Sequence, residues 1–179
     1  EPSWTMRHAR ALGLAARAHV VVFGAGRGGP LRDLKIGARW KISGLSRTAA
    51  RVHGIDLKTY DSAHSRLNKS AADGGLCFFE LHRDADPAGF ARFAGEFLRS
   101  GAPLAFVDYT SARKAVRLKS CFPDEAPGAP RCISDYARML KEAGFLVGDT
   151  LDETRSFMPL IARGWSHWRR VYETARAID

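Results

Sequence analysis

This 179-residue chain has few cysteines and no long apolar run. Its cysteines, Cys77, Cys121 and Cys132, are odd in number, and no two are separated by only two residues. This pattern argues against a disulfide scaffold and a zinc site, and it indicates reduced thiols in the cytoplasm. No stretch approaches the roughly 20 apolar residues that a membrane span requires, and no signal-peptide pattern opens the sequence. We therefore expect a cytoplasmic protein without a bound metal.

The chain also lacks a dense basic tract, although it is basic overall. It has 28 Lys and Arg against 19 Asp and Glu, and a net charge of +9. Such an excess favours an acidic partner, whether nucleic acid, anionic lipid or an anionic small molecule. The basic residues are scattered from Arg7 to Arg176, however, without an interleaved aromatic strand. This distribution disfavours nucleic acid and leaves a small, anionic substrate as the expected partner.

Length and composition predict one soluble domain over residues 1–179. The apolar fraction is 45% and the charged fraction is 26%, and both are ordinary for a globular protein. A chain of this size buries about 70% of the surface that its unfolded form exposes. It begins at Glu1 rather than at methionine, which is consistent with a processed product or with part of a longer polypeptide.

The strongest local signal is the stretch from His19 to Gly29. The run Val20–Phe23 contains three β-branched residues and is typical of a buried parallel strand. The glycines that follow let backbone N–H groups approach a ligand closely, because no Cβ stands in the way. Pro30 suits the first turn of a helix, which we expect over 31–35. Strand, glycine turn and helix are typical of a phosphate- or nucleotide-binding α/β domain, with a purely structural tight turn as the alternative. The GxGxxG positions are Gly24, Gly26 and Gly29.

Strand and helix patterns alternate along the rest of the chain. The expected strands cover 20–23, 39–44, 56–60, 76–81, 103–108 and 145–149. The expected helices cover 4–18, 31–35, 47–53, 86–100, 134–143 and 154–177, with Ser46 and Ser134 as caps. The alternation predicts an α/β fold with a doubly wound, mostly parallel sheet and helices on both faces. The irregular stretch 110–132 is typical of a lid or substrate loop.

These segments follow the order found in class I S-adenosylmethionine-dependent methyltransferases of the small-molecule type, and the resemblance covers nearly the whole chain. Phe23–Gly29 is similar to the first motif of that family. Phe79–Asp84 resembles its fourth-strand segment, and Ser100–Asp108 resembles the loop and strand that follow. The resemblance implies a Rossmann-like methyltransferase fold that binds S-adenosylmethionine. The methyl group would pass to a small-molecule nucleophile mainly by positioning, sometimes with a general base.

The resemblance also assigns roles to individual residues. It implies that the methionine part of the cofactor faces the glycine turn and that the adenine faces the residues after the third strand. The implied cofactor-binding residues are Gly24, Ala25, Gly26, Gly28, Ser46, Asp61, Ser62 and Phe79, and the implied catalytic residue is His82. The pocket is expected at the carboxyl ends of the strands, lined by Gly24, Gly26, Ser46, Asp61 and Phe79. The alternatives are a rim position for His82, a turn cap at Asp61 and a loop cap at Asp108.

Several features depart from the pattern of the family. Val22 and Ser46 stand where the family has acidic residues, at the ends of the first two strands. A serine cannot accept two charge-assisted hydrogen bonds from a ribose diol as a carboxylate does. The segment from Ser46 to Asp61 is short, and we expect no final antiparallel strand. These departures favour, as an alternative, a catalytically inactive module for binding or assembly, with a protein partner or a second copy on the C-terminal helix.

A third hypothesis is a nicotinamide-dinucleotide domain. In that case Ser46-Arg47-Thr48, after the second strand, would suit the 2′-phosphate of NADP. The order of segments from Leu76 to Phe145 favours the methyltransferase arrangement instead. The sequence names neither the methyl acceptor nor the oligomeric state.

Overall fold

The computed structural model describes residues 3–26, 28–47, 54–60, 70–111, 130–163 and 166. The chain divides into two compact units, Glu1–Val147 and Gly148–Asp179. The first unit contains the sheet, and the second contains a helix over 154–163. In the described ranges, no helix combines the length and apolar character needed to cross a membrane. The assignment of 1–179 to a single domain stays a prediction.

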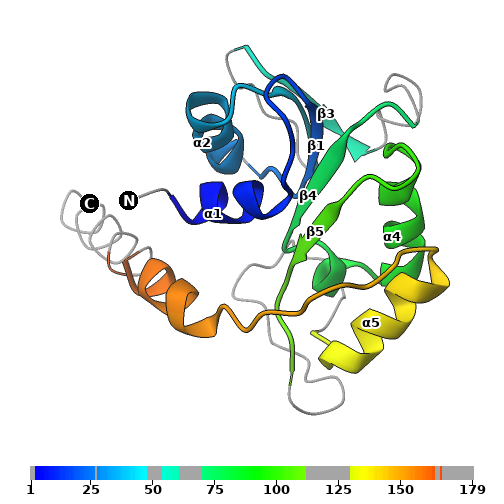
Figure 1. Ribbon diagram of the computed structural model, residues 1–179. Helices are drawn as coiled ribbons and strands as arrows, with labels where there is room; N and C mark the ends of the chain where they lie inside the picture. Colours follow the sequence, from blue (N-terminus) through cyan, green and yellow to red (C-terminus); the bar gives the residue numbers. More distant parts are fainter. Residues whose placement is uncertain are drawn as a thin grey trace, which may run out of the picture. The chain divides into compact units, whose positions relative to one another are not determined.

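The first unit is built around a five-stranded, all-parallel sheet (Figure 1). Its strands are β1 (His19–Phe23), β2 (Lys41–Ser46), β3 (Asp56–Thr59), β4 (Gly74–Phe78) and β5 (Leu104–Val107). They lie in the order β3-β2-β1-β4-β5, so that Val21 of β1 pairs with Ser43 on one side and Gly75 on the other. The order of connection switches between β1 and β4, which is where open α/β sheets bind ligands. The predicted doubly wound parallel sheet is confirmed.

Helices cover both faces of this sheet and create two apolar cores. Helices α1 (Trp4–Ala11) and α2 (Gly29–Gly37) pack on the face that carries Val20 and Val22. Helices α4 (Pro87–Gly95) and α5 (Ile133–Glu142) pack on the face that carries Val21 and Phe23. Because successive side chains of a strand point to opposite faces, the apolar run of β1 supplies both cores. The predicted layers, helix on sheet on helix, are confirmed in this unit.

The bounds of β4 differ from the prediction because glycine enters the sheet. Gly74 and Gly75 belong to the strand, although glycine has a low β propensity. A Cβ on Gly74 would lie 2.6 Å from the Leu14 Cδ1 atom, and one on Gly75 would lie 2.6 Å from the Leu104 Cδ1 atom. Leu14 and Leu104 therefore pack directly against the backbone of β4, which is possible because glycine has no side chain. The strand begins two residues before the expected position.

Residues 145–149 do not form the predicted sixth strand. Gly144 ends α5 with a φ of 92°, and the N–H groups of Gly144 and Phe145 donate back to carbonyls of the last helical turn. This is the Schellman pattern of helix termination. The Phe145 ring then packs against Phe106, with 5.7 Å between ring centroids, whereas Leu146 is fully exposed. The apolar residues after α5 close a helix instead of joining the sheet.

The predicted helix starts agree with the structure only in part. The helix expected from residue 86 does start there: Asp86 is the N-cap of α4, and its Oδ1 accepts the Gly89 N–H at 2.9 Å. Ser134 lies inside the first turn of α5, and the residue at the cap position is Cys132, so the predicted serine cap is wrong. The first helix ends at Ala11 rather than at residue 18. Most of the segments 47–53 and 110–132, and the chain beyond 166, lie outside the described residues.

Candidate functional site

The glycine turn follows the carboxyl end of β1, and its glycines have left-handed backbone conformations, which glycine adopts without strain. The φ angles of Gly24, Gly26 and Gly28 are 73°, 51° and 88°. A Cβ on Gly24 would lie 2.0 Å from the carbonyl oxygen of Phe78, so the backbones of β1 and β4 approach closely here. No atom of another described residue would lie within 4 Å of a Cβ on Gly26. Gly24 is therefore required by packing, whereas Gly26 has room for a ligand beside it.

The other residues that were predicted to bind the cofactor at this turn have structural roles in the fold. Ala25 is fully buried, and its N–H donates to the Leu45 carbonyl at 3.0 Å. Gly28 is the N-cap of α2. Ser46 is only 2% exposed, and its hydroxyl donates to the Gly26 carbonyl at 3.2 Å. Ser46 thus holds the turn against the end of β2, and its predicted contact with a ribose stays a prediction.

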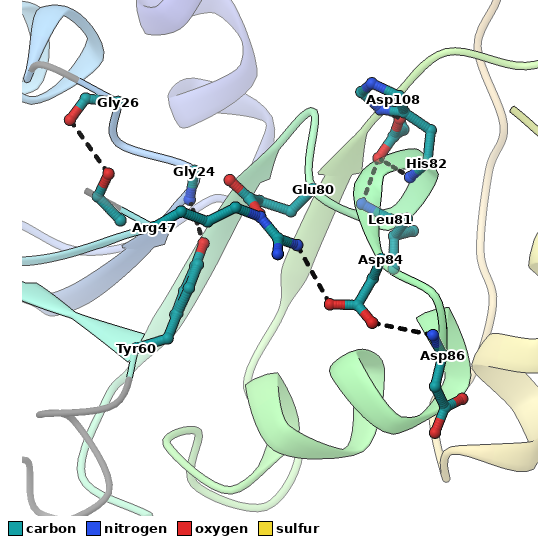
Figure 2. A network of polar contacts seen from close by, with 11 residues as sticks. Gly24, Gly26, Arg47, Tyr60, Glu80, Leu81, His82, Asp84, Asp86 and Asp108 are labelled. Atoms are coloured by element: carbon teal, nitrogen blue, oxygen red, sulfur yellow. Dashed lines mark hydrogen bonds and ion pairs between the residues drawn. The ribbon is translucent and has the colours of Figure 1, made fainter. Parts of the chain in front are cut away.

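Arg47 connects the carboxyl ends of β2 and β4 (Figure 2). Its Nε donates to Glu80 Oε2 at 2.6 Å, and its Nη2 donates to Asp84 Oδ2 at 3.1 Å. The side chain of Glu80 is 4% exposed and that of Arg47 is 28% exposed. Because β1 lies between β2 and β4, the pair spans the end of β1 and its glycine turn. A nearly buried ion pair therefore lies at the switch point of the sheet.

Burial and charge oppose each other in this pair. Burial raises the pKa of the Glu80 carboxyl above its ordinary value, and the Arg47 guanidinium counteracts that rise. Burial by itself would lower the pKa of Arg47, but the carboxylates of Glu80 and Asp84 raise it. The ionised form of Glu80 thus depends on a cation beside it.

Tyr60, immediately after β3, reaches over the same turn. Its hydroxyl accepts the Gly24 N–H at 2.9 Å, and its ring lies 5.8 Å from the guanidinium carbon of Arg47, a cation–π distance. Burial, followed by the charge of Glu80, raises the pKa of Tyr60 far above its ordinary value, so the hydroxyl stays protonated. Side chains from the ends of β2, β3 and β4 therefore meet over the end of β1.

His82 lies on a short 3₁₀ turn, η1 (Leu81–Arg83), and pairs with Asp108 at the end of β5. The His82 Nδ1 atom is 2.5 Å from Asp108 Oδ1, and the two side chains are 14% and 6% exposed. The second oxygen of Asp108 accepts the N–H groups of Leu81 and His82 at 2.7 and 3.3 Å. The carboxylate fixes the ring and favours the tautomer with the proton on Nδ1, which leaves Nε2 as the basic nitrogen. This arrangement can act as a general base.

Phe79 directs the chain from β4 into the turn that carries His82. Its φ of 57° is uncommon for an aromatic residue. Its ring stacks on Trp4 and on Tyr109, with centroid distances of 5.9 and 5.0 Å, and its N–H donates to the Val107 carbonyl at 2.8 Å. These contacts hold the left-handed conformation, and they explain why β4 ends before Phe79 rather than at Leu81. The predicted cofactor contact of Phe79 stays a prediction.

A cleft of about 490 Å³ lies beside the Arg47 network, a volume that suits a small organic molecule. Its aromatic and charged lining differs from the predicted set. The lining residues are Arg47, Tyr60, Asp84, Asp86, Gly89, Phe90 and Phe93. Of the predicted pocket residues, Asp61 lies outside the described part of the chain, as does the predicted ligand Ser62. Within the described part, no group of three or more His, Cys, Asp or Glu residues is placed to hold a metal ion.

Sequence reasoning missed the roles of Arg47, Tyr60, Glu80 and Asp84. Arg47 and Glu80 are 33 residues apart, and their opposite charges carry no local signal. Their position could have indicated them: Arg47, Tyr60 and Glu80 lie within two residues of the carboxyl ends of strands, and Asp84 ends the turn after β4. Parallel sheets gather their functional groups at this edge.

No known family model and no curated protein matches this sequence. Among solved structures, phosphoethanolamine N-methyltransferase 2 of Haemonchus contortus, with phosphomonomethylethanolamine and S-adenosylhomocysteine, matches with a TM-score of 0.73 and 14% identity over 98% of this chain and 45% of that chain. A methyltransferase of Aquifex aeolicus, described as dependent on S-adenosylmethionine, matches with a TM-score of 0.64 and 18% identity over 84% of each chain. The [4+2]-cyclase SpnF matches with a TM-score of 0.63 and 18% identity over 81% of this chain and 57% of that chain.

These similarities establish the fold. The chain has the Rossmann-like fold of class I S-adenosylmethionine-dependent methyltransferases, as the resemblance of its segments predicted. It spans less than half of the Haemonchus contortus chain. Because a cyclase is among the similar structures, the fold does not determine the reaction.

Proposed function

We propose that this protein is an S-adenosylmethionine-dependent methyltransferase that acts on a small molecule in the cytoplasm. The observation that carries the proposal is the glycine turn at the switch point of a methyltransferase-type sheet, where no described residue fills the space next to the Cβ position of Gly26. The structural similarity to methyltransferases over most of the chain supports it.

The residues around the turn fit this cofactor. No described residue occupies the space on the Cβ side of Gly26, and the side chain of Glu80 lies close to Gly24. When bound, S-adenosylmethionine supplies an electrophilic methyl group on a sulfonium centre. The turn from Gly24 to Gly28 would hold the methionine part, and Asp61 and Ser62 would hold the adenine.

His82 is the general base of the proposed reaction. Because Asp108 engages the Nδ1 atom, Nε2 is the nitrogen that would accept a proton from the hydroxyl or amine of an acceptor. Asp108 acts as a positioning residue through His82. The acceptor would lie in the cleft, where Arg47 and the carboxylates of Asp84 and Asp86 offer polar contacts of both signs. His82 does not line this cleft; it lies on the turn that ends at the lining residue Asp84, so the acceptor would have to extend toward it. An anionic acceptor, expected from the net charge, stays a prediction.

Calorimetric titration with S-adenosylmethionine, S-adenosylhomocysteine and NADPH tests this proposal. We expect micromolar binding of the first two ligands and no binding of NADPH. Gly26→Leu should abolish the binding and keep the far-UV circular dichroism spectrum. Binding of NADPH alone, or no binding of any of the three to folded protein, would overturn the proposal.

A catalytically inactive binding or assembly module is a second candidate. The observation that favours it is the closed set of contacts among Arg47, Glu80 and Asp84, which spans the position expected for a cofactor. In this alternative, the ion pairs are a permanent structural lock and the partner binds the C-terminal helix. Release of S-adenosylhomocysteine during incubation with a panel of small amines, phenols and acids separates the two candidates, because a module produces none.

A further inference from the structure

Glu80, two residues after the end of β4, places its side chain beside the glycine turn (Figure 2). A Cβ on Gly24 would lie 2.9 Å from Glu80 Cγ. Val22 of β1, which stands at an acidic position of the resembling family, is fully buried in an apolar core. A carboxylate near the turn therefore comes from the end of β4, and not from β1.

We propose that Glu80 receives the cationic end of S-adenosylmethionine, and that Arg47 is an internal cation that occupies this position until the ligand replaces it. The inference rests on the proposed function and adds to it the residue that selects a cationic ligand. The Glu80 carboxylate is nearly buried, and such a group is strongly destabilising when no cation accompanies it. If the cationic end of S-adenosylmethionine replaces Arg47, the negative charge of Glu80 has a cation beside it both before and after the ligand binds.

The second partner of Arg47 makes this exchange feasible. Asp84 Oδ2 lies 3.1 Å from Arg47 Nη2. The side chains of Arg47 and Asp84 are 28% and 27% exposed, whereas the side chain of Glu80 is 4% exposed. The arginine is thus the more accessible member of the buried pair and can keep one carboxylate while it leaves the other. Its long side chain allows this movement, whereas Glu80 directly precedes the turn that Asp108 holds through backbone hydrogen bonds.

Calorimetric titration of four variants tests the proposal. Glu80→Gln should weaken the binding of S-adenosylmethionine about ten- to a hundredfold, because a charge-assisted contact is lost. Arg47→Met should tighten it, because the competing cation is gone, and the double variant should bind as weakly as Glu80→Gln. Arg99→Met is the matched control, since Arg99 pairs with Asp73 at 2.8 Å, just before the start of β4, and it should bind as the unmodified protein does.

The ligand and the variants together separate the outcomes. S-adenosylhomocysteine keeps the ammonium but lacks the sulfonium charge, so weakening of both ligands by Glu80→Gln assigns the ammonium, and weakening of S-adenosylmethionine alone assigns the sulfonium. Unchanged binding by Glu80→Gln would overturn the proposal, as would weaker binding by folded Arg47→Met. If Arg47→Met does not fold, the double variant decides, because it leaves no unpaired Glu80 carboxylate: weak binding supports the proposal, and unchanged binding overturns it. Absence of binding to the unmodified protein would instead overturn the proposed function.

Discussion

The carboxylate of Asp108 joins the end of β5 to the turn after β4 through its contact with His82, in which Oδ1 and Nδ1 are 2.5 Å apart. The same carboxylate accepts the N–H groups of Leu81 and Tyr109, both at 2.7 Å. Backbone N–H groups from the turn after β4 and from the residue after Asp108 therefore hold the carboxylate in place, and the carboxylate in turn fixes the orientation of the His82 ring.

We predict that Asp108→Asn lowers kcat for methyl transfer and leaves the affinity for S-adenosylmethionine unchanged. The amide no longer secures the Nδ1 tautomer, so fewer molecules have a basic Nε2. His82→Gln should lower kcat more, by about 10²- to 10⁴-fold, because the base itself is lost. Rates of S-adenosylhomocysteine release and calorimetric affinities provide the measurement. Asp73→Asn is the control, because Asp73 lies just before the start of β4, at the opposite end of that strand from His82 and Asp108, and its kcat should not change. An unchanged kcat in Asp108→Asn would contradict the prediction.

The two glycines of the turn should respond differently to alanine. In Gly24→Ala the new methyl would collide with the Phe78 carbonyl at 2.0 Å, and we expect a loss of about 2–5 kcal/mol in the free energy of unfolding. In Gly26→Ala the new methyl has no atom of another described residue within 4 Å, so we expect only the cost of the left-handed backbone, about 1–2 kcal/mol. Urea denaturation measures both values. Equal losses would show that the close approach of β1 and β4 does not set the cost at Gly24.

The pH dependence of stability should reveal Glu80. Burial raises its pKa in the folded state above the ordinary value of 4.5, so the folded protein binds more protons than the unfolded chain just above that pH. The contribution of Glu80 to the free energy of unfolding is complete below pH 4.5 and is lost as the pH rises through the folded-state pKa. We predict that the stability of the unmodified protein relative to Glu80→Gln falls across this window. Denaturation series at several pH values measure it, and a rise would show a lowered pKa instead.

The sequence was most informative where the signal is local. A run of three valines followed by glycines predicts β1 and its turn, because burial on both faces and left-handed backbone each require specific residue types. The same reasoning failed at Phe145, where an apolar triplet after a helix looks like a strand. A ring contact with Phe106 and a Schellman turn use these residues differently, and neither is visible in a short window.

The candidate site was predictable only in position. The pattern of apolar residues located the strand ends, and this was sufficient to predict which edge of the sheet carries the candidate site. The pairing of Arg47 with Glu80 depends on β1 lying between their strands, which is a property of the whole topology. The resemblance predicts a catalytic role for His82, and that role stays a prediction. Its contact with Asp108 could not be expected until β5 was placed beside β4.

The central place of β1 also sets the order in which the fold can be completed. Among the described strands β1 comes first in the chain, yet β4, its second neighbour in the sheet, ends only at Phe78. Until then Val20–Phe23 is an edge strand with an apolar run and unpaired backbone groups, a surface that favours pairing with other chains. Parallel pairings between distant segments form slowly. The emerging chain therefore passes through an aggregation-prone stage that ends when β4 docks, and a fragment that stops before Gly74 should remain in that stage.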